Sequence, residues 1–147
     1  MRRLCVAALV VAGCNELTPE QEYEALTDRV AIECGAYEVN YPVDDKRMPP
    51  MHLCGDRPNV ACMNDAVAGT EIAHLLHSYR GPLPMYLLRE AHYFAGDGRL
   101  VRLNYYQVGL DDPAWLRWHC ESLSTESYDV DGVTCWNFVV GGCGDRF

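Results

Sequence analysis

Two histidines, His74 and His77, are three residues apart, a spacing that would place two metal ligands on one face of a helix. Residues 72–79 are instead predicted to form a strand, whose side chains alternate between its two faces. The two imidazoles would then point to opposite sides. Because the sequence also has no HExxH motif and no second pair of ligands, we predict no metal site.

Other residues of chemically active types have surroundings that favour simpler roles. Asp111 and Asp112 could form an acid–base pair, but adjacent carboxylates before a proline are more typical of a solvated turn. His92 and His119 are expected to project from strands as packing or surface groups. The chain has no GxSxG motif, no CxxC motif and no phosphate-binding loop. We therefore predict no catalytic residue and no cofactor, and an enzyme is the less favoured class.

The N-terminal part of the chain is predicted to contain two helices. Thr18 as the N-cap, Pro19 at the first helical position and Gln21 three residues after the cap are typical of a helix start. Hydrophobic residues at helical spacing then predict a helix over residues 19–33. A second, short helix is predicted over residues 59–70.

In the rest of the chain, apolar runs alternate with turn-forming residues, a pattern that predicts strands joined by turns. Residues 35–60 are rich in proline and glycine and are expected to be irregular, with at most a short strand at residues 36–41. Further strands are predicted over residues 72–79, 85–95, 99–108, 115–123 and 132–140. The predicted fold class is α+β, with N-terminal helices packed on a disulfide-stapled antiparallel sheet of four or five strands.

A Gly-Asp-Gly turn joins the two best-defined strands, and its length fixes their register. A three-residue loop would pair Tyr93 with Val101 and gather apolar residues on one face. A two-residue Asp-Gly loop would instead set His92 against Leu103. We predict the three-residue loop, because a slip of one residue moves a whole apolar set to the other face.

The first fourteen residues have the order of an export signal. Arg2 and Arg3 are followed by an apolar run over residues 4–11, and then by the small residues Ala12 and Gly13. As a helix this run would span about 12 Å, far short of the roughly 30 Å of a bilayer core. It is therefore not a transmembrane anchor.

The residues Val-Ala-Gly-Cys at positions 11–14 resemble the lipobox of bacterial lipoproteins, although the apolar run is short for such a signal. The resemblance implies that residues 1–13 are removed and that Cys14 carries the lipid. Residues 14–18 are then a tether and residues 19–147 a single domain. Several acyl chains would anchor the protein stably. Ordinary secretion and a buried N-terminal strand are the alternatives.

The chain has eight cysteines. If Cys5 is removed with the signal and Cys14 is lipidated, an even number is left, as expected for a disulfide framework in an oxidising compartment. The remaining cysteines are Cys34, Cys54, Cys62, Cys120, Cys135 and Cys143.

Sequence alone does not choose the pairing of these cysteines, but the predicted elements give a preference. A C-terminal hairpin centred near residues 127–128 would set two cysteines opposite each other, and two more flank a Gly-Asp-Arg-Pro turn. The preferred pairs are Cys120 with Cys135, Cys54 with Cys62 and Cys34 with Cys143. In the main alternative, Cys34 pairs with Cys54 or Cys62 and the C-terminal cysteines pair among themselves.

Charge and aromatic residues indicate the kind of partner. The net charge of −9 argues against binding to nucleic acid, which requires a basic face.

Trp115, Trp118 and Trp136 lie on neighbouring predicted strands, and Trp115 and Trp118 point to opposite faces. At least one of them is therefore expected at the surface as an interaction site. The alternative is that the three tryptophans belong to the hydrophobic core, which is the more usual position for this residue type in a small domain.

The spread of cysteines and a Cys-x-x-Leu sequence at residues 120–123 resemble small cysteine-rich bacterial lipoproteins, a class that supplies no active site to transfer. The resemblance implies a non-enzymatic, lipid-anchored protein of the cell envelope, in the outer membrane, that binds an envelope partner or has a structural role. The alternative is a small secreted enzyme or hydrolase inhibitor on a cystatin-like or NTF2-like scaffold, with His92, His119 or Asp111 converging in a pocket.

Overall fold

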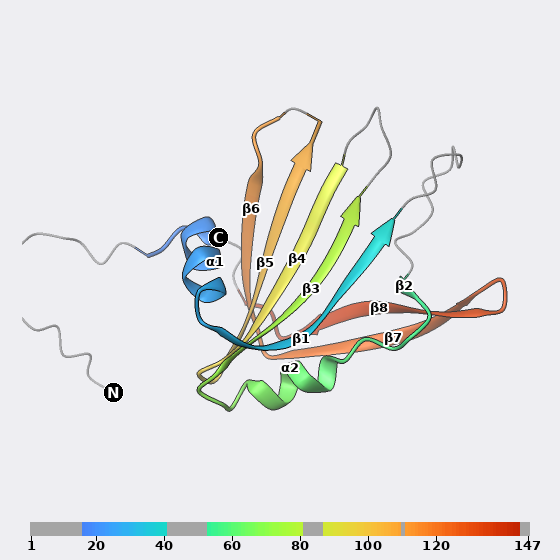
Figure 1. The fold of residues 1–147 in the computed structure, drawn as a ribbon, viewed down its shortest axis with the longest axis horizontal. Helices are drawn as coiled ribbons and strands as arrows, with labels where there is room; N and C mark the ends of the chain where they lie inside the picture. Colours follow the sequence, from blue (N-terminus) through green and yellow to red (C-terminus); the bar gives the residue numbers. More distant parts are fainter. Residues whose placement is uncertain (1–15, 41–52, 81–86, 110, 145–147) are drawn as a thin grey trace, which may run out of the picture.

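The computed structural model describes residues 16–40, 53–80, 87–109 and 111–144, which form two helices and eight strands (Figure 1). The helices are α1 (Pro19–Thr27) and α2 (Val60–Ala66). The strands are β1 (Val30–Asn40), β2 (Leu53–Cys54), β3 (Ile72–Arg80), β4 (Leu87–Gly96), β5 (Arg99–Val108), β6 (Ala114–Cys120), β7 (Ser122–Val130) and β8 (Val133–Gly141). Neither helix is long and apolar enough to cross a membrane.

The strands form two sheets, so the predicted α+β fold with a single antiparallel sheet is wrong. The order is β1-β3-β4-β5-β6 in the large sheet and β2-β8-β7 in the small one. Of the described residues, 61% are in strands and 15% in helices, which makes the protein mostly β. In addition, β1 pairs with β3 in parallel, whereas the other pairings between described strands are antiparallel.

The first helix begins as predicted and ends earlier. Thr18 and Gln21 form a reciprocal capping box and Pro19 is the first helical residue. The helix stops at Thr27, and residues predicted as its second half form the start of β1. Val30 and Ile32 are β-branched, and such side chains lose less freedom in a strand than in a helix. Pairing with β3 therefore prevails over a weak helical periodicity.

The C-terminal strands leave the large sheet at Glu121. One strand was predicted over residues 115–123, but β6 ends at Cys120 and β7 begins at Ser122 in the other sheet. The β7–β8 hairpin turns at Asp131 and Gly132, which both have positive φ as a type I′ turn requires. The predicted centre at residues 127–128 is therefore wrong.

The register of the β4–β5 hairpin also differs from the prediction. The turn has two residues, Asp97 and Gly98, both with positive φ, and it pairs His92 with Leu103 and Phe94 with Val101. The three-residue loop was chosen to gather apolar residues on one face. That reason does not hold here, because apolar residues are buried on both faces of the large sheet.

The two faces of the large sheet have separate cores. On one, here called the α2 face, α2 and the small sheet cover buried residues that include Met63, Leu75, Tyr93, Leu100 and Leu123. On the other, the α1 face, α1 buries Leu26 against Ile72, Phe94, Val101 and Leu103. In Figure 1, α2 and the β7–β8 hairpin lie across one end of the fan of strands, and β3–β6 extend well beyond them.

Three disulfides cross-link the described residues, and their pairing corrects the preferred one. Cys34 in β1 bonds to Cys62 in α2, and Cys54 in β2 bonds to Cys135 opposite it in β8. Cys120 at the end of β6 bonds to Cys143. The first and third bridges agree with parts of the alternative pairing. Cys120 cannot face Cys135, because Tyr128 is the residue opposite Cys135. Three disulfides indicate an oxidising location, extracellular or in the envelope.

Candidate ligand-binding site

The α2 face carries a polar hollow beyond the part covered by α2 and the small sheet. Strand register places three rows of side chains side by side across β3, β4 and β5. The rows are Leu75–Tyr93–Arg102, His77–Ala91–Asn104 and Tyr79–Arg89–Tyr106. Ala91 is at the centre and has the smallest of these nine side chains. A cavity of about 30 Å³ is left there.

We call this cavity the arginine pocket; it is lined by His77, Tyr79, Arg89, Ala91, Arg102, Asn104 and Tyr106, and is also bordered by Ser78 and Glu90. Arg89, Arg102 and Tyr106 are half-buried, whereas Ala91 and Asn104 are buried. The charged groups therefore stand at the edge of the cavity, within reach of a ligand from solvent, and the small residue forms its interior.

Arg102 is held in place by aromatic rings and an amide. Its guanidinium carbon lies 5.3 Å from the ring centroid of Trp118 and 5.7 Å from that of Tyr93. Its Nε donates a hydrogen bond of 2.9 Å to Oδ1 of Asn104. Cation–π contacts and one hydrogen bond fix the guanidinium plane and leave the Nη donors without a hydrogen-bond partner among the described residues.

Arg89 is oriented by Tyr106. The guanidinium carbon lies 5.0 Å from the Tyr106 ring centroid, and Nη2 is 3.3 Å from the phenolic oxygen. Nδ2 of Asn104 donates to the same oxygen at 3.0 Å. Burial alone would raise the pKa of Tyr106, but these two hydrogen bonds and the charges of Arg89 and Arg102 outweigh it and lower the pKa. The pocket thus has a field that favours negative charge.

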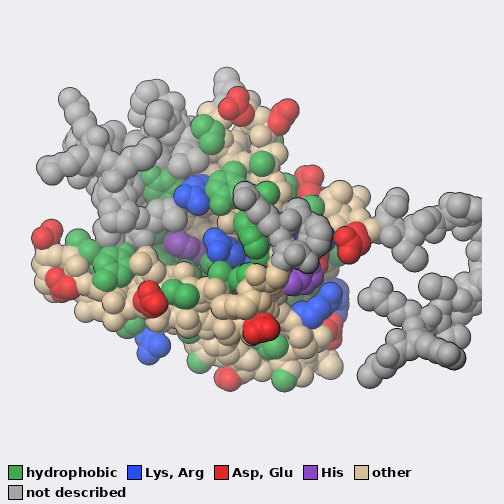
Figure 2. Space-filling model, turned by 180° about the vertical axis from the view of Figure 1, so that it is seen from behind, with side chains coloured by type: hydrophobic (Ala, Val, Ile, Leu, Met, Phe, Trp, Pro, Cys, Tyr) green, Lys and Arg blue, Asp and Glu red, His purple; other side chains and the backbone are tan. Residues whose placement is uncertain are grey.

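No carboxylate of the described residues forms an ion pair with either arginine. Glu90 borders the pocket, but its carboxylate lies 3.0 Å from Nε2 of His92 on the opposite face. In a chain with a net charge of −9, two cations that line one cavity without a counter-ion among the described residues are unusual. Figure 2 shows basic and histidine side chains near the middle of one face of the molecule, with acidic ones mostly around its margin.

His77 completes the pocket as a neutral group. Its Nε2 is buried and has no hydrogen-bond partner within the described part of the chain, and its ring lies 5.1 Å from that of Phe138. Burial, followed by the charges of Arg102 and Arg89, lowers its pKa to about 4. A buried nitrogen without a hydrogen-bond partner costs free energy.

The low pKa of His77 predicts that the protein is less stable in acid. Below the unfolded-state pKa of about 6.5 the unfolded chain binds a proton that the native chain does not, so stability falls as the pH drops from 6.5 to 4. The loss attributable to His77 is about 3 kcal/mol at most. Urea unfolding at pH 7 and at pH 4.5 would measure it. His77→Gln should lose less stability between these pH values, and an equal loss in both proteins would contradict the assignment.

The α1 face holds a second cluster of polar residues, in which four side chains contact one another in a row. Nδ1 of His74 lies 3.2 Å from Glu33, and Nε2 of His74 lies 3.1 Å from Nδ1 of His92. Nε2 of His92 lies 3.0 Å from Glu90, and Tyr23 of α1 packs edge-on against His92. Burial lowers the pKa of His74, although Glu33 opposes this effect. These contacts satisfy ring nitrogens of His74 and His92 on the face that α1 covers.

The structure places His74 and His77 on opposite faces of β3, as their spacing on a strand predicts. Within the described residues no cluster of three or more His, Cys, Asp or Glu side chains could hold a metal ion. The groups named for an enzymatic alternative do not converge. His92 is buried under α1, whereas Asp111 is exposed in the segment before β6 and His119 is exposed near the end of β6.

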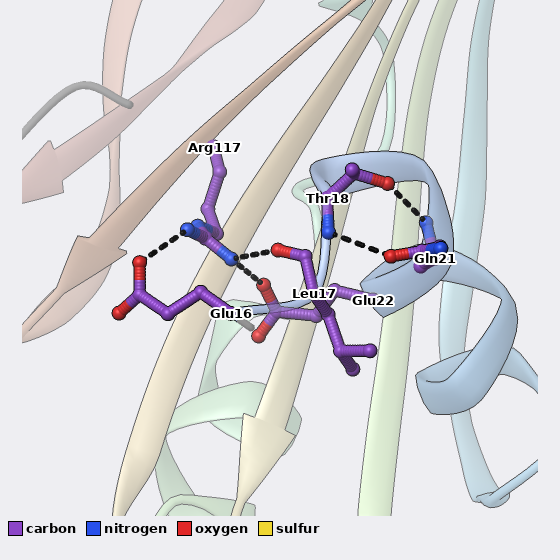
Figure 3. Close-up of polar contacts among 6 residues, drawn as sticks. All are labelled: Glu16, Leu17, Thr18, Gln21, Glu22 and Arg117. Atoms are coloured by element: carbon purple, nitrogen blue, oxygen red, sulfur yellow. Dashed lines mark hydrogen bonds and ion pairs between the residues drawn. The ribbon is translucent and has the colours of Figure 1, made fainter. Parts of the chain in front are cut away.

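A buried arginine of β6 binds the start of α1 (Figure 3). Nη1 of Arg117 donates to the Leu17 carbonyl at 3.0 Å and to Glu22 at 2.8 Å, and Nη2 lies 3.8 Å from Glu16. Arg117 is 7% exposed. These contacts join residues about a hundred positions apart in the sequence and hold α1 on the large sheet.

The three tryptophans lie in three different surroundings, each half-buried. Trp115 packs on the α1 face beside Tyr23, and Trp118 packs on the α2 face beneath Arg102. Trp136 of the small sheet donates from Nε1 to the carbonyl of Gly55. An interaction surface at these residues stays a prediction, and Trp118 is the one that contacts an arginine of the pocket.

Sequence reasoning did not identify the arginine pocket. Its signal is present in the alternation Arg89-x-Ala91 and Arg102-x-Asn104-x-Tyr106, which places these residues on one face of two neighbouring strands. They come together only in the register set by the two-residue turn. The other register would have put Arg89 and Arg102 on opposite faces.

Comparisons with protein-family models, with curated proteins and with solved structures found no match to the chain. The site is therefore interpreted from its own geometry. The predicted lipidation residue, Cys14, and the predicted signal at residues 1–13 lie outside the described residues.

Proposed function

We propose that this chain is a lipid-anchored, non-enzymatic protein of the bacterial cell envelope that binds a partner through the arginine pocket. The observation that carries the proposal is the pair Arg89 and Arg102, oriented by aromatic and amide contacts and without a carboxylate partner among the described residues. Rigid donors that already face a cavity bind a ligand at a low entropic cost.

The export and lipobox pattern ending at Cys14 and the three disulfides support the location. An outer-membrane position follows from the lipoprotein resemblance. Arg117 holds Glu16 and the Leu17 carbonyl. Since two residues span at most about 7 Å, a lipidated Cys14 would keep the domain next to the membrane surface. The proposed protein is thus a binding domain displayed close to its membrane.

A pull-down from envelope extracts tests the binding role. The doubly substituted Arg89→Gln/Arg102→Gln protein should lose partners that the unaltered domain retains, because the oriented donors are removed. The control is Arg57→Gln/Arg99→Gln, which changes the net charge equally at two exposed residues outside the pocket. The binding role would be rejected if both double variants retained the same partners as the unaltered domain.

Mass spectrometry of the protein isolated from its native membrane tests the anchor. The expected N-terminal residue is Cys14 with a diacylglycerol on its sulfur. The same protein should partition into the detergent phase. Cys14→Ser should remain unlipidated and appear in the soluble fraction. A retained Met1 with a free thiol at Cys14 would contradict the lipoprotein proposal and leave the pocket unaffected.

A further inference from the structure

The size of the arginine pocket limits what it can accept. A volume of about 30 Å³ compares with the roughly 10–15 Å³ that one water requires. The cavity therefore has room for about two oxygen-sized atoms. A whole metabolite does not fit, but the end group of a larger molecule does.

The donors around the cavity select the chemistry of that end group. Arg89 and Arg102 come from neighbouring strands and both line the cavity. A guanidinium presents paired N–H donors in one plane, which match the two oxygens of a carboxylate. His77 also lines this cavity, and its buried Nε2 has no hydrogen-bond partner among the described residues. Two cationic donors and room for about two oxygens, beside the His77 ring, describe a site for a single planar anion.

We propose that the arginine pocket binds one carboxylate group of a larger ligand, held by Arg89 and Arg102 above the methyl group of Ala91. Phosphate is the weaker candidate, because the volume of its four oxygen atoms is larger than the volume of the cavity. A carboxylate of this kind ends a peptide chain or an acidic side chain. This inference rests on the proposed binding function and specifies its ligand.

Ala91 offers a test that leaves every charge in place. In Ala91→Val two added methyl groups would occupy the centre of the cavity, and valine is well suited to a strand. The variant should therefore fold and lose the site. Arg102→Gln removes a donor and keeps the cavity. Arg99→Gln is the matched control, since Arg99 starts the same strand and is exposed outside the pocket.

The readout is the NMR signal of the His77 ring in the purified, disulfide-bonded domain during titration with sodium acetate or inorganic phosphate at constant ionic strength. Acetate should shift the signal saturably and raise the His77 pKa by about one unit or more, because it brings a negative charge beside the ring. The affinity should fall at least about tenfold in Ala91→Val and Arg102→Gln, and stay within twofold in Arg99→Gln.

Two further probes separate the sources of the carboxylate. N-acetyl-glycylglycine carries a chain-terminal carboxylate, and N-acetyl-glutamic acid amide carries a side-chain carboxylate. Tighter binding of either one than of acetate supports the proposal and names the source. Saturation by phosphate but not by acetate would overturn it, as would an absence of saturation or equal effects of Arg102→Gln and Arg99→Gln. If acetate binds but no envelope partner depends on the arginines, the proposed function fails and the carboxylate site stands.

Discussion

Replacing Cys54 and Cys135 together by alanine is expected to lower the free energy of unfolding by about 4 kcal/mol, the largest loss among the three disulfides. This bridge closes the longest loop, with a sequence separation of 81 residues against 28 and 23 for the others. It also holds β2, which has two residues and is too short to stay paired by its own hydrogen bonds. Its loss should therefore release Leu53 from the core as well.

Urea unfolding followed by tryptophan fluorescence would measure this effect. The matched control is Cys120→Ala/Cys143→Ala, which also removes one bridge but opens a shorter loop. The longer loop should cost about 1 kcal/mol more on entropy alone, and the release of β2 adds to that difference. A loss in the control that equals or exceeds the loss at Cys54 and Cys135 would contradict the role assigned to the bridge.

Arg117→Met should cost about 3 kcal/mol of stability, because it removes the partner of a carboxylate that stays buried. The side chain of Glu22 is 12% exposed and that of Arg117 is 9% exposed. Taking one member from a buried pair leaves an uncompensated charge, which is much more costly than the pair itself was stabilising. The loss of the hydrogen bond to Leu17 should also loosen the start of α1.

Two comparisons separate this effect from the loss of an ordinary ion pair. Glu22→Gln/Arg117→Met should recover part of the lost stability, because no charge is then left buried. Arg29→Gln breaks the exposed pair with Asp97, whose side chains are 52% and 38% exposed, and should cost less than about 1 kcal/mol. A loss in Arg117→Met as small as that in Arg29→Gln would show that the pair does not hold α1.

Features that depend on neighbours in the sequence were predictable. The capping box of Thr18 and Gln21 involves residues three positions apart, so the start of α1 follows from local chemistry. The bounds of β5, residues 99–108, and the side-to-side alternation of His74 and His77 likewise need only the strand period. The prediction that the six cysteines from Cys34 to Cys143 form disulfides was also made from the sequence alone.

Features that depend on which layer covers which face were not predictable in this way. The β4–β5 register seemed to require one apolar face, yet α1 covers Phe94 and Val101 while Tyr93 is buried on the other side. The disulfide pairing depends on the point at which the chain changes sheets, Glu121. No property of residues 120–123 alone distinguishes a strand that continues from one that crosses to another sheet.

The sequence by itself determined the helix start, most strand positions and the set of cysteines that form disulfides, because each depends on residue types and short spacings. The tertiary structure alone decided the mostly β two-sheet fold, the three disulfide pairs and the arginine pocket. These depend on contacts between residues far apart in the chain, whose free energies are settled only when all layers pack together. Arg89, Ala91 and Arg102 show the difference, since each is ordinary in its own strand and a site forms only where register places them on one face around one cavity.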